Sequence, residues 1–288
     1  MPASSLFLLS LQPTTPIATF IPLLLLSSTT SPSPSPILIA RPLRWIITPW
    51  MSDASPHETS TIETLKSTTW DLLLIFPTVL TTLLTDNPTL APHIRASYTL
   101  TVGISSAILS GFAEKNKQLL HPRDPPPPLT GSSNLQDASR TNSSTKNLEL
   151  SPDLLAWFSR PSTPRTAISM LNLLAFREGK LDSYKAYGRA FATDVGRRRG
   201  GVAKVVGRTV QQQQQQQEEE DKVWDEIAVA HYPSVWHFAD MVISDDYQRA
   251  NAEHRIGALR GTCILCCDEL DAQVREGLEK AGAHKAKI

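Results

Sequence analysis

The sequence from residue 166 to residue 270 predicts an α+β domain whose elements follow the order β-α-β-β-α-β. The first observation is an apolar run from Ala167 to Phe176, which has the length and composition of a buried strand. A stripe of apolar residues at helical spacing comes next, followed by two further strand-like runs. A helical region then precedes a last strand-like run, Thr262 to Cys267. This order predicts a fold class but no reaction.

The first strand is apolar on both of its faces. Met170 and Leu174 point to one face, whereas Leu171 and Leu173 point to the other. Helices in a β-α-β-β-α-β unit cover one side of its sheet, so a second layer must cover the opposite side. We expect the sheet of a second copy of this chain to do so, which predicts a homodimer.

The remaining elements of this domain follow from spacing and composition. The first helix is predicted from an apolar stripe formed by Leu181, Tyr184, Gly188, Phe191 and Val195. Val202 to Val210 and Trp224 to Tyr232 are expected to form the second and third strands. The Gln-rich segment 211–221 between them cannot bury apolar area, so we expect a solvated loop insertion. Residues 271–288 predict a C-terminal helix and tail.

The first 165 residues are predicted to lie outside this domain. Residues 1–61 are expected to form a largely disordered or helical low-complexity extension, without aspartate, glutamate or lysine before residue 53. Residues 62–120 predict one or more apolar helical segments. Residues 121–150 are a Pro/Ser-rich linker, and residues 151–165 predict a short helix and a connector.

Two features of this N-terminal part leave alternatives open. For residues 1–50, a translation start at Met51 is favoured over an organellar transit peptide and over a secretory signal. Ser97 to Ala113 contains no charged residue and is near the lower length limit of a membrane span. A soluble helix is favoured for this segment, with membrane contact by residues 97–113 as the alternative.

Charge and cysteine content exclude several classes of function. Lysine plus arginine and aspartate plus glutamate each number 28, so no overall field attracts nucleic acid. Cys263, Cys266 and Cys267 lie in one strand-like run, where they are expected to be buried rather than paired or metal-bound. Free thiols favour an intracellular location, cytoplasmic in the first place and mitochondrial in the second. The sequence contains no glycine-rich phosphate loop or metal-ligand motif, so no cofactor and no metal are expected.

Several motifs resemble a known family when they are taken in order. They are Met170 to Arg177, Tyr184, Tyr187-Gly188, Arg199-Gly200-Gly201, Trp224 to Ala228, Tyr232-Pro233-Ser234, Ser244 to Gln248 and His254-Arg255. Together they resemble a small domain-of-unknown-function family of the dimeric α+β barrel (ferredoxin-like) superfamily, related to EthD-type and NIPSNAP-type proteins. The resemblance implies a dimer whose sheets enclose one cavity per subunit. It implies no established chemistry.

Five residues are candidates for a site in such a cavity. Asn172 is the single amide in an apolar strand and needs partners, either a ligand or a neighbouring backbone group. His254 is the candidate acid or base, because histidine titrates near neutral pH. Arg255 could pair with a ligand carboxylate. Tyr184 and Tyr187 could form the wall and direct a hydroxyl inward.

Two hypotheses for the function follow, and the sequence does not decide whether the protein is an enzyme. The favoured one is a protein that binds or transforms a small organic molecule, such as an acid, phenol or aldehyde, without a metal or nucleotide cofactor. The alternative is a non-catalytic dimerisation or adaptor module, because no recognisable catalytic constellation is present.

Overall fold

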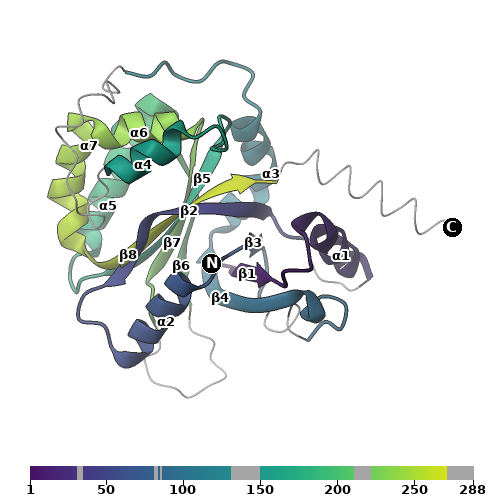
Figure 1. Ribbon diagram of the computed structural model, residues 1–288. Helices are drawn as coiled ribbons and strands as arrows, with labels where there is room; N and C mark the ends of the chain where they lie inside the picture. Colours follow the sequence, from purple (N-terminus) through teal and green to yellow (C-terminus); the bar gives the residue numbers. More distant parts are fainter. Residues whose placement is uncertain (31–34, 81–83, 85, 131–149, 211–221, 271–288) are drawn as a thin grey trace.

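Eight antiparallel strands close into a barrel in the order β1-β3-β2-β8-β5-β7-β6-β4 (Figure 1). The structure is a computed structural model that describes residues 1–30, 35–80, 84, 86–130, 150–210 and 222–270. The strands are β1 (Ala3–Leu11), β2 (Leu38–Met51), β3 (Leu72–Phe76), β4 (Ile94–Ile104), β5 (Ile168–Phe176), β6 (Val202–Thr209), β7 (Glu226–Tyr232) and β8 (Leu259–Glu269). Closure pairs every one of these strands on both sides, so the sheet has no free edge.

The helices lie outside the barrel, with α4 to α7 grouped over one side of it (Figure 1). The α-helices are α1 (Ile17–Thr30), α2 (Pro56–Ser67), α3 (Ser106–Leu120), α4 (Pro152–Ser159), α5 (Leu181–Ala190), α6 (Val235–Ile243) and α7 (Asp245–Ala250). Short turns of other helix types are η1 (Ala91–His93), η4 (Phe191–Val195), η5 (Arg197–Arg199), η7 (Asn251–Arg255) and η8 (Ile256–Ala258). Serine side chains begin several helices: Ser105 and Ser151 each accept a hydrogen bond from the backbone three residues on, and Ser55 forms a capping box.

The two halves of the chain contribute four strands each to the barrel. The first half lies in the order β4-β1-β3-β2 and the second in the equivalent order β8-β5-β7-β6. The halves meet where β2 pairs with β8 and where β4 pairs with β6. The prediction of a ferredoxin-like domain that completes a dimeric α+β barrel with a second chain is therefore wrong, because one chain closes the barrel alone.

The predicted disordered or helical N-terminal extension is likewise wrong. Residues 3–11 form β1, which lies between β3 and β4 and is buried at all but its first residue. Residues 38–51 form β2, the strand that joins the first half to β8. Short apolar runs fit a buried strand as well as a helix, and the absence of aspartate, glutamate and lysine in residues 1–52 is consistent with the burial of β1.

The segment Ser97 to Ala113 is not a single helix. Strand β4 ends at Ile104, and α3 begins at Ser106 after a cap by Ser105. None of the described helices has both the length and the apolar composition that a membrane span requires. The Gln-rich segment 211–221, the tail 271–288 and most of the linker 121–150 lie outside the described residues.

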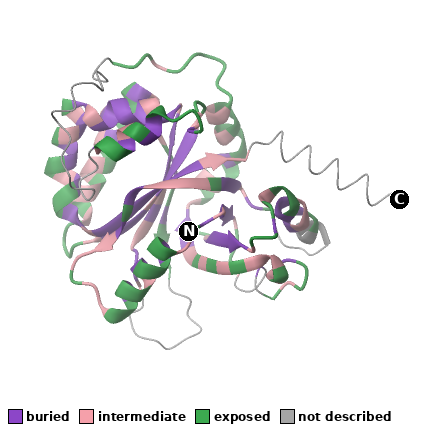
Figure 2. Ribbon diagram, in the orientation of Figure 1, coloured by how far each residue is buried: buried purple, intermediate pink, exposed green. Residues whose placement is uncertain are grey.

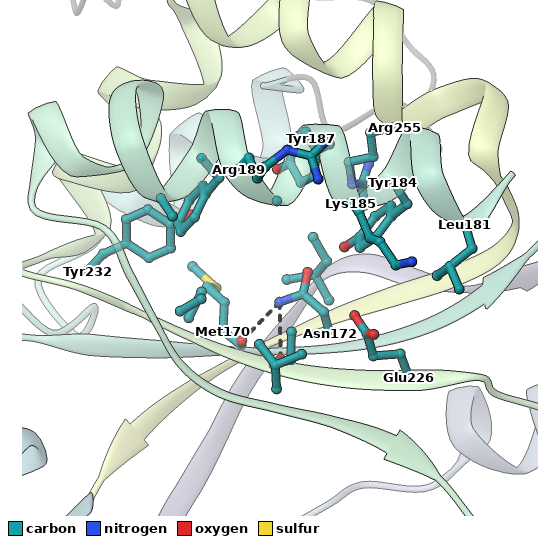
Figure 3. A pocket seen from close by; sticks show the side chains of 18 of the residues that line it. Met170, Asn172, Leu181, Tyr184, Lys185, Tyr187, Arg189, Glu226, Tyr232 and Arg255 are labelled. Atoms are coloured by element: carbon teal, nitrogen blue, oxygen red, sulfur yellow. Dashed lines mark hydrogen bonds between the residues drawn. The ribbon is translucent and has the colours of Figure 1, made fainter. Parts of the chain in front are cut away.

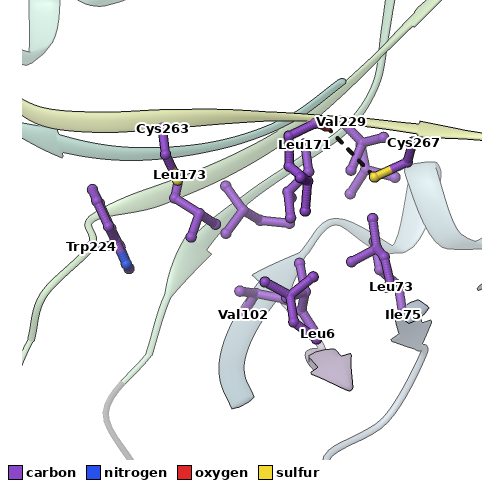
Figure 4. Close-up of a cluster of buried hydrophobic side chains, with 14 of the residues drawn as sticks. Leu6, Leu73, Ile75, Val102, Leu171, Leu173, Trp224, Val229, Cys263 and Cys267 are labelled. Carbon is purple, nitrogen blue, oxygen red and sulfur yellow. Dashed lines mark hydrogen bonds between the residues drawn. The ribbon is translucent and has the colours of Figure 1, made fainter. Parts of the chain in front are cut away.

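The barrel interior holds a packed apolar core to which both halves contribute (Figures 2 and 4). Leu6 and Leu73 of the first half lie in the same cluster as Leu171 and Leu173 of β5. The opposite face of β5 packs in a second cluster with α4, α6 and α7. The second layer that the sequence demands for β5 is thus the N-terminal half of the same chain. The homodimer stays an untested prediction, but the apolar face that suggested it is covered.

A buried ion pair of the second half lies at one end of the barrel, and Asn116 of the first half is hydrogen-bonded to both of its members. The Lys204 ammonium of β6 contacts the Glu269 carboxylate of β8, and both side chains are almost fully buried. Asn116 of α3 donates a hydrogen bond of 2.8 Å to Glu269 and accepts one of 2.7 Å from Lys204. Burial alone would raise the Glu269 pKa, but Lys204 and the hydrogen bonds from Ser169 and Asn116 outweigh burial and lower it.

Candidate functional site

A cavity of about 490 Å³ lies between the C-terminal helices and the outer face of the sheet formed by β5, β7 and β6 (Figure 3). The sheet supplies its floor, from Met170, Asn172, Glu226, Ala228 and Ala230. The helices and their extensions supply its roof, from Leu181, Tyr184, Lys185, Tyr187, Phe191 and Arg255. The cavity is therefore separated from the barrel interior by the sheet itself.

The cavity exists because small side chains lie under α5. Strand alternation directs Ala228 and Ala230 toward the helices, and Ala228 is paired with Asn172 on β5. The larger Ile227 and Val229 point the other way, into the barrel core. Alanine methyl groups cannot fill the space below a helix, so a gap remains at this part of the floor.

Arg255 is a buried cation without an anionic partner among the residues that the structure describes. It lies in η7, where its residue is 2 % exposed, and no described carboxylate forms an ion pair with it. Its Nη1 is 3.5 Å from Asn251 Oδ1, and its Nη2 has no hydrogen-bond partner within the described structure. A guanidinium remains protonated in proteins, and an unpaired buried charge is costly. Arg255 is therefore suited to receive an anion from outside the protein.

Tyrosine rings surround Arg255. Its guanidinium carbon is 6.0 Å from the centroid of the Tyr187 ring, a cation–π distance. The Tyr184 and Tyr187 rings are 5.5 Å apart, and the Tyr187 and Tyr247 rings are 6.3 Å apart. Burial raises the pKa of Tyr184, Tyr232 and Tyr247, so these hydroxyls stay neutral. Of these three residues, Tyr184 and Tyr232 line the cavity, and the Tyr232 hydroxyl already donates to Met241 Sδ. The neutral Tyr184 hydroxyl can therefore donate a hydrogen bond to an anion held by Arg255.

Asn172 presents its side-chain oxygen to the cavity. Its amide nitrogen donates to the backbone oxygens of Met170 at 3.0 Å and Ala228 at 3.4 Å. The reverse orientation would place an oxygen against two carbonyl oxygens, so these contacts fix the amide. Oδ1 then points toward the helices (Figure 3). The sequence left two roles open for Asn172, a bond to a neighbouring backbone group or a bond to a ligand. The amide nitrogen is bonded to backbone oxygens, and the side-chain oxygen is available to a ligand.

Glu226 places a carboxyl group at the floor of the cavity. It lies at the start of β7, on the same face as Ala228. No hydrogen bond joins its carboxylate to any described residue. Burial raises the Glu226 pKa; Arg208 opposes this shift, and the neighbouring Asp225 adds to it. Sequence reasoning missed this residue, although it is the one acidic side chain in a largely apolar strand.

The structure brings together four of the five predicted site residues and leaves one apart. Asn172, Tyr184, Tyr187 and Arg255 all line the cavity, whereas His254 does not. The His254 Nε2 lies 3.6 Å from a Glu253 carboxylate oxygen, and its side chain is 29 % exposed. The imidazole therefore faces away from the site, where it cannot act as the acid or base of this cavity.

The described residues do not bring three or more histidine, cysteine or acidic side chains into a cluster that could hold a metal. The three cysteines are buried and unpaired in β8, and burial raises the pKa of each thiol. Raised thiol pKa values disfavour the thiolate form that metals bind. The polar groups of the cavity are its arginine, lysine, hydroxyl, amide and carboxyl groups.

Comparison with known proteins gives no functional assignment. No family model matches the sequence, and no curated protein matches it either. Among solved structures, this chain is similar to RPA0582, a protein of unknown function from Rhodopseudomonas palustris. The identity is 26 %, over 43 % of this chain and 97 % of that one, with a TM-score of 0.36. The methylated form of RPA0582 gives 27 % identity over 43 % and 96 %, with a TM-score of 0.35. The resemblance to EthD-type and NIPSNAP-type proteins stays a prediction.

Proposed function

We propose that this protein binds a small organic acid in the cavity between α5 and the sheet, without a metal or nucleotide cofactor. The observation that carries the proposal is Arg255, a buried cation whose Nη2 has no hydrogen-bond partner among the described residues. A ligand carboxylate would neutralise the charge and satisfy this nitrogen. Guanidinium and carboxylate match in geometry and form strong, charge-assisted hydrogen bonds.

The rest of the cavity suits an apolar body attached to that carboxylate. Met170, Phe191 and Ile264 provide apolar walls, and Tyr184 adds an aromatic face beside Arg255. A volume of about 490 Å³ lies within the range of small-molecule sites in proteins. Such a volume accommodates an acid with an aryl or branched alkyl group.

Ligand entry is proposed from the side of β6. Ala203 and Val206 of β6 line the cavity and are exposed, with Val206 at 37 %. The apolar character of these two residues supports passage of an apolar molecule. Arg255 lies deeper, on the helix side, so the carboxylate would enter first and the apolar body would follow.

The alternative function, a dimerisation or adaptor module, has less support. Its arguments were the long low-complexity N-terminal region and the absence of a recognisable catalytic constellation, and residues 3–11 and 38–51 of that region form barrel strands. An intracellular location, cytoplasmic rather than mitochondrial, remains a proposal based on the three free cysteines.

The test compares acids with their uncharged counterparts. Purified full-length protein is heated with 3-phenylpropanoate or 4-methylpentanoate, and with the primary amide of each. A ligand at a hundred times its dissociation constant stabilises the native state by about 2.7 kcal/mol, which raises the melting temperature measurably. We expect the acids to raise the melting temperature and the amides to leave it unchanged. Equal effects of acid and amide, or no effect of any acid, would overturn the proposal.

A further inference from the structure

We infer that the cavity catalyses proton transfer at the carbon next to the carbonyl group of a 2-keto acid, with Glu226 as the base. This inference rests on the proposed function, because it requires that Arg255 hold the carboxylate of the same ligand. It goes further by assigning a reaction and a catalytic residue to the site.

The first argument is the position of Glu226 relative to the anion site. Glu226 lies on the floor, diagonal to Asn172 across the pair formed by β5 and β7. Arg255 and Tyr184 lie on the roof, on the opposite side of the cavity (Figure 3). A keto acid held by its carboxylate at the roof would extend toward the floor. Its carbonyl oxygen would then face hydroxyl donors, and its next carbon would face a carboxylate.

The second argument is that no structural hydrogen bond uses the Glu226 carboxylate among the described residues. The carboxylate of its neighbour Asp225 accepts a hydrogen bond of 2.7 Å from the Phe176 backbone, but the Glu226 carboxylate accepts none from the described residues. The charged groups around it are Arg208, Asp225 and Lys185. Lys185 is 2.8 Å from Asp182, and its side chain is 49 % exposed. Lys185 therefore shares its charge with Asp182 while it also lines the cavity above Glu226 (Figure 3), and no hydrogen bond or ion pair to a described residue occupies the Glu226 carboxylate.

Burial also makes Glu226 a stronger base than an exposed carboxylate. Its pKa is raised from the ordinary value of 4.5, which brings it closer to neutral pH. A base is most effective when its pKa lies near the working pH while enough of it remains ionised. No oxidant, metal or nucleotide is needed for a proton transfer of this kind.

The step is balanced within the ligand and the protein. The Glu226 carboxylate takes a proton from the carbon next to the carbonyl group, and the carbon–hydrogen electron pair forms a carbon–carbon double bond. The carbonyl electron pair moves to its oxygen, giving an enolate that Arg255 and the Tyr184 hydroxyl stabilise. The proton on Glu226 then returns to the carbon, which restores the carbonyl group and the Glu226 carboxylate. In D₂O, exchange with solvent at this stage places deuterium on the carbon.

The experiment measures deuterium uptake and binding in parallel. 4-Methyl-2-oxopentanoate is incubated in D₂O at neutral pH with the wild-type protein, with Glu226→Gln and with Glu253→Gln, and its C3 protons are followed by NMR. Glu253 is an exposed carboxylate beside His254 and outside the cavity, which makes it the matched control. Affinity for the same keto acid is measured by calorimetric titration of each protein.

We expect wild type and Glu253→Gln to accelerate exchange equally over buffer. Glu226→Gln should lower the rate at least 100-fold while its affinity changes by less than threefold, because a general base contributes about 10²–10⁴ to the rate. Binding without accelerated exchange, or exchange that Glu226→Gln leaves intact, would overturn the inference while the proposed function stands. If 3-phenylpropanoate binds and the keto acid does not, the inference also fails. Failure of every acid to bind refutes the proposed function itself.

Discussion

Arg255 shows how a single residue can identify a site by its lack of a partner. Arg199, another buried arginine of the same half, contacts Asp246 at 3.1 Å through two nitrogens. Arg255 has only tyrosine rings and one long contact to Asn251 among the described residues. Retaining an unpaired buried charge lowers stability, and such residues concentrate where binding needs them.

His231 gives a prediction that concerns a single titratable residue. It lies on β7, paired with Ser169 at the end of the barrel that holds Lys204 and Glu269. Burial, with Lys204 as the next cause, lowers the His231 pKa from 6.5 to about 4, so the folded state favours the neutral ring. The stability that this residue contributes is full above pH 6.5. It is lost as the pH falls from 6.5 to about 4, and the loss amounts to about 3 kcal/mol.

Urea unfolding at pH 7 and at pH 4.5 checks this expectation. His231→Gln should reduce the difference in unfolding free energy between the two pH values by about 1–3 kcal/mol relative to wild type. His57→Gln, which alters an exposed histidine of α2, should leave the difference unchanged. A difference as large in His231→Gln as in wild type would show that His231 does not titrate in this way.

The junction of β4 and β6 gives a prediction at the scale of elements. This seam has three paired positions, of which Ile104 and Gly207 form one. A methyl group on Gly207 would lie 3.0 Å from the Gly103 oxygen and 3.1 Å from Ile104 Cγ1. Gly207→Ala is therefore expected to lower the free energy of unfolding by about 1–3 kcal/mol.

Gly111 of α3 provides the matched control for this seam. A methyl group there would meet no atom within 4 Å, and alanine favours a helix by up to about 1 kcal/mol over glycine. In urea denaturation, the free energy of unfolding of Gly207→Ala should thus be lower than that of wild type, and that of Gly111→Ala should equal or exceed it. Equal stability of the two variants would mean that β4 and β6 are not paired as described.

Strand alternation along β5 agrees with the position of Asn172 at the cavity, whereas the predicted fold is wrong. The period of two along β5 places Asn172 on the helix side and Leu171 on the other, as the structure shows. Tyr184, Tyr187 and Arg255 line the same cavity. The spacing of residues in the sequence could not show that His254 lies outside the cavity. The π-type turn η7 changes the helical periodicity here, so that Arg255 faces the cavity and His254 does not. Glu226 could have been found by the same reasoning that found Asn172.

At the scale of the whole molecule, the sequence indicated that β5 needs a second layer but not where that layer comes from. The hydrophobic effect is non-directional, so the apolar face of β5 can be buried equally well by a second chain or by another part of the same chain. The strands that provide the layer, β1 and β3 among them, are short apolar runs that also fit helices. Both halves share one strand order around the barrel, yet the cavity described here lies beside the second half.

The most direct test of the proposed site is the affinity of 3-phenylpropanoate for Arg255→Met, measured by isothermal titration calorimetry. Methionine keeps the apolar length of arginine and removes the charge, and Arg255 has no ion pair among the described residues whose loss would disturb the fold. Arg249→Met, at an exposed position of α7, is the control. Hydrogen bonds to a charged group contribute about 1.5–3 kcal/mol, so Arg255→Met should weaken binding about 10- to 100-fold while Arg249→Met binds like wild type. Equal affinity of Arg255→Met and wild type would contradict the assignment of Arg255 as the anion site.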